Sequence, residues 1–146
     1  MTRAMAVPRA PLAGTVLDLL ERSRASLLSA CHADSVADRY VEAHLAALRA
    51  AAALLAARSR PSRRAQLRSV WEVLPQVAPE LTEWAVFFAD SAQRRAALAR
   101  SSAGVVAREA AYLARQAGVF VDRVHGALRP PRARSVLGSR PGPVRP

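Results

Sequence analysis

The stretch Val106–Leu128, VAREAAYLARQAGVFVDRVHGAL, carries the clearest structural pattern in the chain. At about 100° per residue its apolar side chains fall within one narrow arc, and its charged side chains lie outside that arc. The apolar set is Val106, Ala110, Leu113, Ala117, Phe120, Val121, Val124 and Leu128. A single stripe of this kind predicts an amphipathic helix whose apolar side faces a protein core rather than a cofactor.

The segments before this stretch show the same helical spacing. We expect one helix over residues 12–33 and a second from an N-cap at Asp34 or Ser35 to about Arg58. Pro79 suits the first turn of a third long helix, and Ser102 offers a cap for the fourth. Residues 68–74 predict a short helix that ends before the proline at position 75.

These helices predict an all-α protein: an antiparallel bundle of four to five helices over residues 12–128. The 33 alanines let helices approach closely. The large side chains are expected to gather around the third long helix and plug one end of the bundle; they are Trp71, Trp84, Phe87 and Phe88. Residues 1–11 and the Arg- and Pro-rich residues 129–146 are expected to be disordered termini.

The charge of the chain is unevenly distributed. The formal net charge is +11, and all 22 basic residues are arginine. Twelve of these arginines lie in residues 1–11, 58–68 and 129–146, and the other ten face eleven acids in the predicted helices. A uniformly basic surface is therefore excluded. A codon bias toward arginine and alanine explains the excess of arginine equally well, although not its location.

Several functional classes are excluded or disfavoured by composition. One cysteine cannot form a disulfide framework or a zinc cage built on several sulfurs. The run Cys31, His32 and Asp34 offers too few ligands, so neither a metal site nor any other cofactor is expected. Cys31 is instead expected to be the last core position of the first helix. The N-terminus lacks the apolar core of a secretory signal, and the apolar run Ala50–Ala57 is too short to span a membrane. The expectation is a cytoplasmic protein without a membrane partner.

One spacing is compatible with catalysis. Arg39 and His44 can in principle cleave RNA without a metal, with histidine moving the proton and arginine stabilising the phosphorane. Residues five apart differ by about 140° around a helix axis, so these two can reach one phosphate only through a kink in the helix or across a dimer interface. The competing interpretation is that His44 is buried in the core and Arg39 lies on the surface.

A second candidate is the arginine-rich segment 58–68. It carries Arg58, Arg60, Arg63, Arg64 and Arg68, which predict phosphate contacts with strong salt dependence and little sequence preference. The competing interpretation is a solvated loop without a partner. No aromatic residue is interleaved before Trp71, so stacking of bases within this segment is not predicted.

Three blocks of the sequence resemble one family. Residues 39–58 (RYVEAHLAALRAAAALLAAR), residues 69–85 (SVWEVLPQVAPELTEWA) and residues 107–113 (AREAAYL) are similar to an actinobacterial branch of the HEPN superfamily. The resemblance spans about residues 12–128. It implies a small helical bundle, commonly a homodimer, with a role in RNA cleavage, nucleotide binding or toxin–antitoxin defence.

The resemblance also implies where an active member would differ from this chain. Active members carry Arg-x4–6-His near the last helix, with a polar residue directly after the arginine. Here Arg39 and His44 lie in the second predicted helix and Tyr40 follows the arginine, whereas the fourth helix offers only the shorter Arg123-x-His125. We therefore expect a non-catalytic binding or assembly module, associated with RNA or an acidic protein. The alternative is a metal-independent ribonuclease using Arg39 and His44.

Overall fold

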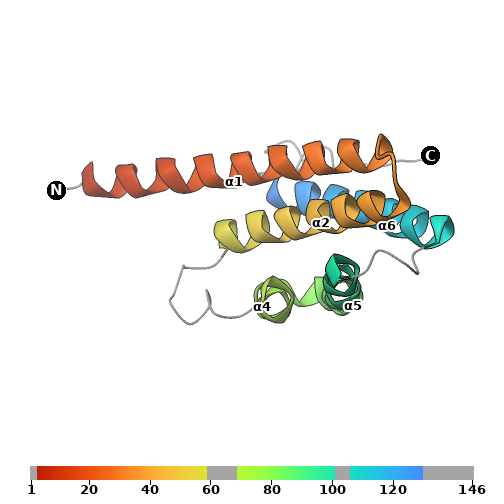
Figure 1. Cartoon of the computed structure of the whole chain (residues 1–146). Coiled ribbons are helices and arrows are strands. Elements are labelled where there is room, and N and C mark those ends of the chain that lie inside the picture. Colours follow the sequence, from red (N-terminus) through yellow and green to blue (C-terminus); the bar gives the residue numbers. More distant parts are fainter. Residues whose placement is uncertain (1–2, 59–68, 101–105, 130–146) are drawn as a thin grey trace, which may run out of the picture.

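The computed structural model describes residues 3–58, 69–100 and 106–129, with the side chains from residue 14 onward. These ranges form five α-helices and one short 3-10 helix, and they contain no strand. The all-α bundle predicted from the sequence is confirmed. Helices α1, α2 and α6 are seen from the side in Figure 1, while α4 and α5 are seen nearly along their axes and cross them.

Helices α1 (Arg3–Cys31) and α2 (Val36–Arg58) form an antiparallel pair joined by a short turn. The backbone N–H of Asp38 donates to the Ser35 hydroxyl at 2.9 Å, so Ser35 caps α2 as predicted.

The start of α1 differs from the prediction. The helix begins at Arg3 rather than at residue 12, so residues 3–11 are part of α1. It passes through two prolines, at positions 8 and 11. A proline inside a helix lacks a backbone donor and clashes with the carbonyl four residues earlier, yet this helix continues through both positions. At the other end of the chain, residues 130–146 lie outside the described residues.

Helix α2 is the centre of the fold and contacts α1, α4, α5 and α6. Its buried residues are mostly alanine: Ala43, Ala46, Ala47, Ala50, Ala51 and Ala53 are all fully buried. Hydrogen bonds hold α1 against it, because Ser23 donates to the Ala46 carbonyl at 2.7 Å and Arg49 donates to Ser26 at 2.6 Å. Helix α2 is also long and apolar enough to cross a membrane, but half of its most apolar 18-residue stretch is buried inside the bundle.

The connection to the third long helix is more regular than predicted. Ser69 caps α4 (Val70–Val77), which continues past Pro75 instead of ending before it. The side chains of Trp71, Val73 and Leu74 are buried, and this burial outweighs the one donor that the proline lacks. A 3-10 turn, η1 (Pro79–Leu81), then leads directly into α5 (Thr82–Arg100). The proline expected in the first turn of the third long helix thus begins the 3-10 turn just before it.

Helix α6 (Ala107–Leu128) buries the stripe identified in the sequence. Its six buried residues are Ala110, Leu113, Ala117, Phe120, Val121 and Val124, whereas Val106 just before the helix is exposed. Val106 occupies the N-cap position, so Ser102 is not the cap; Ser102 lies outside the described residues.

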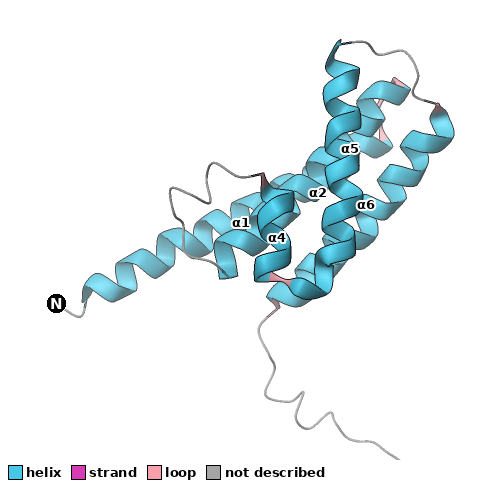
Figure 2. Cartoon of the chain, turned by 90° about the horizontal axis from the view of Figure 1, so that it is seen from below, coloured by secondary structure: helices cyan, strands magenta, loops and turns pink. Residues whose placement is uncertain are grey.

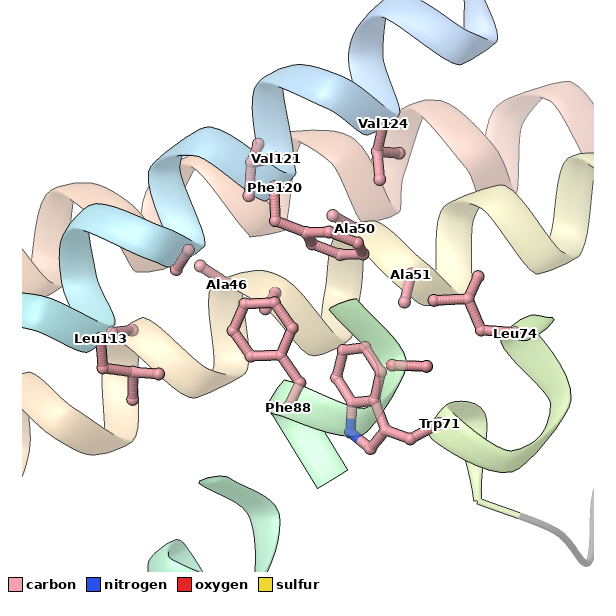
Figure 3. Packing of buried hydrophobic residues seen from close by; sticks show 14 of the residues in the cluster. Ala46, Ala50, Ala51, Trp71, Leu74, Phe88, Leu113, Phe120, Val121 and Val124 are labelled. Carbon is pink, nitrogen blue, oxygen red and sulfur yellow. The ribbon is translucent and has the colours of Figure 1, made fainter. Parts of the chain in front are cut away.

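Aromatic rings fill the space between α2, α4, α5 and α6 (Figure 3). Trp71 stacks on Phe88 with ring centroids 5.2 Å apart, and Phe88 lies 5.1 Å from Phe120. Phe88 and Phe120 are fully buried beside the alanines of α2. The rings therefore gather around α5 as predicted: Trp71 and Phe88 are buried in the core, whereas Trp84 and Phe87 are partly buried and pack against it.

Substitution of Ala50 by leucine tests the close packing of α2. Added carbon atoms at a fully buried alanine must push neighbouring helices apart, so we expect Ala50→Leu to lower the free energy of unfolding by about 1–3 kcal/mol. Urea denaturation measures this change. The control is Ala57→Leu on the same helix, where the side chain is exposed and a change below about 0.5 kcal/mol is expected. Equal effects of the two substitutions would contradict the packing described above.

Candidate functional site

Arg39 lies on α2 and is bound to the end of α1. Its Nε donates to the Ala30 carbonyl at 3.1 Å. The last turn of α1 has no basic residue of its own, and carbonyls at a helix C-terminus lack partners within the helix. Arg39 supplies both a donor and a positive charge to this end. Its guanidinium therefore helps to fix the turn between α1 and α2.

His44, also on α2, lies in the core. Its side chain is only 1% exposed, and its Nδ1 is 2.7 Å from the Ser91 hydroxyl of α5. Ser91 donates its own hydrogen to the Phe88 carbonyl at 3.0 Å, so it can only accept from His44. The neutral imidazole therefore carries its proton on Nδ1.

The environment of His44 keeps it uncharged. Burial, and secondarily the positive charge of Arg95, lowers its pKa from 6.5 to about 4. A general base in RNA cleavage needs a pKa near the working pH and access to the substrate, and this imidazole has neither. Arg39 and His44 are therefore not brought together by the structure, and each is used in helix packing.

The lowered pKa of His44 predicts that the folded protein loses stability in acid. The folded pKa lies below the unfolded one, so protonation favours the unfolded chain as the pH falls from 6.5 toward about 4. The shift corresponds to a loss of up to about 3 kcal/mol across that window. We expect His44→Gln, which does not titrate, to reduce the fall in unfolding free energy measured by urea denaturation at several pH values.

His32→Gln is the matched control for this experiment, because His32 is exposed on the turn after α1. That variant should keep the pH dependence of the native chain. If His44→Gln and the native chain lose stability equally between pH 6.5 and about 4, the buried neutral state of His44 is wrong.

Among the arginines of the segment 58–68, the structure describes Arg58 alone. It ends α2, and its guanidinium forms an ion pair with Glu80 at 3.3 Å. Arg60, Arg63, Arg64 and Arg68 lie outside the described residues. The nucleic-acid site predicted for this segment therefore stays a prediction.

The structure reveals an arginine–histidine contact that sequence spacing does not predict. Arg24 of α1 donates from Nε to Nε2 of His125 on α6 at 3.1 Å, across 101 positions of sequence. His125 Nδ1 lies 3.1 Å from the Val121 carbonyl and must carry the proton, because a carbonyl can only accept. His125 is thus paired with Arg24 and not with Arg123, which stands over the Trp84 ring.

A small depression opens between α2, α5 and α6. It has a volume of about 280 Å³, and Tyr40, Asp90, Tyr112 and the ion pair between Arg94 and Glu109 contribute to its lining. Arg94 donates to both carboxylate oxygens of Glu109, at 2.9 and 3.0 Å. Burial, followed by the negative charge of Glu109, raises the pKa of Tyr40 to about 12. This phenol therefore stays protonated at neutral pH.

Cys31 is exposed, so the expectation that it is the last core position of the first helix is wrong. The helix ends at this residue, where the chain turns toward α2. The neighbouring His32 Nδ1 lies 3.0 Å from the Leu28 carbonyl. No cluster of three metal-ligating side chains is found in the part of the chain that the structure describes.

Comparison with known proteins gives one match. The family model described as HEPN_SAV_6107-like HEPN matches residues 30–125, from the end of α1 almost to the end of α6. No curated protein and no solved structure matches the chain significantly.

Proposed function

The chain belongs to the HEPN_SAV_6107-like HEPN family, and we propose that it is a non-catalytic HEPN module that associates with RNA through its arginine-rich segments. The observation that carries the proposal is the placement of Arg39 and His44. The Arg39 guanidinium caps α1, and the neutral His44 imidazole is buried against Ser91. Both side chains therefore stabilise the packing of the helices.

The distribution of charge supports association with RNA. All eleven acids of the chain lie in the described helices and turns, where fourteen arginines accompany them. The other eight arginines lie in residues 59–68 and 130–146, which contain no acid. Two acid-free segments with several arginines each can neutralise RNA phosphates without nearby carboxylates competing for them. Affinity then comes from the release of counterions and depends weakly on sequence.

Binding to single-stranded RNA tests this function. Replacing Arg60, Arg63, Arg64 and Arg68 by alanine should lower affinity and flatten its salt dependence. With about 0.7 counterions released per phosphate contact, the slope of log affinity against log salt should fall by up to about 3. Fluorescence anisotropy with a labelled RNA, over a salt range of roughly 50 to 200 mM, measures both quantities.

The control replaces the same four arginines by lysine, which keeps the charge and should keep most of the slope. An unchanged slope in the alanine variant would refute the role of this segment. Competition by poly-glutamate that is stronger than competition by unlabelled RNA would identify an acidic protein partner instead.

A cleavage assay tests the non-catalytic character of the module. We expect no cleavage of cellular RNA by the native chain above the level seen with Arg39→Ala and His44→Gln. Cleavage that both substitutions abolish, in variants that keep the native circular dichroism spectrum, would establish the ribonuclease alternative. Cleavage lost only in His125→Ala would assign the activity to the Arg24–His125 pair, and that result would also refute the proposal.

A further inference from the structure

The hollow between α2, α5 and α6 holds a polar group that the packing of the helices does not use. Figure 2 looks from below, where α5 lies across α2 and α6. The hollow of about 280 Å³ is lined by residues of these three helices, among them Tyr40 of α2. Tyr40 is only 5% exposed, yet its hydroxyl makes no hydrogen bond to another described residue. Because buried polar groups normally have partners, this phenol is placed for a partner that enters the hollow.

The hydroxyl of Tyr40 lies on the side of the hollow. Three charged side chains act on its ionisation: Glu109, Arg94 and Asp90. All three also line the hollow. Charges act most strongly at short range, so these side chains and the hydroxyl surround the same space. The protonated phenol brings one donor and two acceptor lone pairs to it.

The charges that line this hollow favour a cation. They are the carboxylates of Asp90 and Glu109 and the guanidinium of Arg94. Arg94 donates to both carboxylate oxygens of Glu109, at 2.9 and 3.0 Å, so these two charges offset each other. Asp90 is exposed and has no ion-pair partner among the described residues. An anion would be repelled by Asp90 and would have to displace Glu109 from Arg94.

The rings in the lining favour an organic cation over a metal ion. Phe87 and Tyr112 both line the hollow and meet edge to face, with centroids 5.9 Å apart. Aromatic faces attract ammonium groups, and their apolar surface covers the attached methylene groups. Arg115 already lies over the Tyr112 ring from the neighbouring hollow, which it lines together with Arg108. Phe87 is therefore the ring that a ligand would cover.

A second hollow continues along α5 and repeats this chemistry. Its volume is about 430 Å³, and Phe87 lines both hollows. Its charged lining again consists of two carboxylates and one guanidinium: Glu80, Glu83 and Arg123. Glu80 is paired with Arg58, and Arg123 lies 5.9 Å from the centre of the Trp84 ring. Glu83 is exposed and, within the part of the chain that the structure describes, has no ion-pair partner.

Glu83, Phe87 and Asp90 form one line along α5. Steps of four and three residues bring them to nearly the same side of the helix, and the two acids are about 10 Å apart along its axis. A chain of methylene groups with an ammonium group at each end matches this order of acid, ring and acid. We propose that the two hollows bind linear alkyl diamines, whose ammonium groups pair with Asp90 and Glu83 while the methylene groups cover Phe87. The Tyr40 hydroxyl accepts a hydrogen bond from the ammonium group at Asp90.

Isothermal titration calorimetry of the full chain tests the site with four small molecules. Diaminooctane, whose nitrogens are separated by about the distance between the two acids, should bind at least about fivefold more tightly than octylamine, which has one charge, or diaminobutane, which is too short. Suberate, a dianion of similar length, should not bind. In NMR spectra diaminooctane should shift the indole N–H of Trp84, which lines the second hollow, and not that of the buried Trp71.

Three substitutions examine the proposed contacts separately. Glu83→Gln and Asp90→Asn each remove one charge and keep the shape, so each should weaken diaminooctane binding by about fivefold, to the level of octylamine. Tyr40→Phe removes only the hydroxyl and should weaken binding by at least about threefold. Glu21→Gln, an exposed substitution on α1, is the control and should leave binding unchanged. Circular dichroism confirms that each variant keeps the native fold.

Any of three results would overturn the proposal. They are equal binding of diaminooctane and octylamine, unchanged binding in the double variant Glu83→Gln/Asp90→Asn, and complete displacement of diaminooctane by magnesium chloride at an ionic strength where sodium chloride does not displace it. The last result would assign the acids to a metal ion instead. These measurements contain no RNA and leave the arginine-rich segments unchanged, so they are independent of the proposed RNA association.

Discussion

The fold depends on how closely helices approach the alanine-lined surface of α2. Six fully buried alanines leave room for α1 on one side and for the rings of Trp71, Phe88 and Phe120 on another. Such small side chains contribute little apolar area themselves. The stabilising area comes from the large side chains of α4, α5 and α6 that pack against them. A larger residue on α2 would displace several helices at once.

The close packing around α2 explains the positions of Arg39 and His44, the two residues that most resemble a catalytic pair. Because α2 is enclosed, a polar residue on its inner side must find a partner inside the bundle, and His44 finds it in Ser91. Arg39 lies nearer the start of the helix, where it reaches the open end of α1. Both side chains are thus held by the packing of α2. The functional surface proposed for this chain is accordingly the set of arginine-rich segments, which lie outside the packed centre of the bundle.

The structural features that can be predicted from this sequence are mainly those that depend on residues close together in one helix. The stripe of α6 and the cap at Ser35 depend on neighbours within one helix, so their patterns are visible in the chain. The course of α4 past Pro75 is not predictable in this way, because the burial of Trp71 decides it. The same holds for Ser91, which lies 47 positions from His44 and has nothing in its local sequence that marks it as buried. The contact between Arg24 and His125 is likewise visible only once α1 and α6 lie together.

His44 is a neutral core residue and not an acid–base group. Nitrogen and carbon chemical shifts of its imidazole, followed by NMR during a pH titration with and without single-stranded RNA, test it most directly. We expect a proton on Nδ1, a neutral ring down to a pH of about 4, and no change in the shifts when RNA is added. A ring that titrates near 6.5, or whose shifts move when RNA is added, would contradict it.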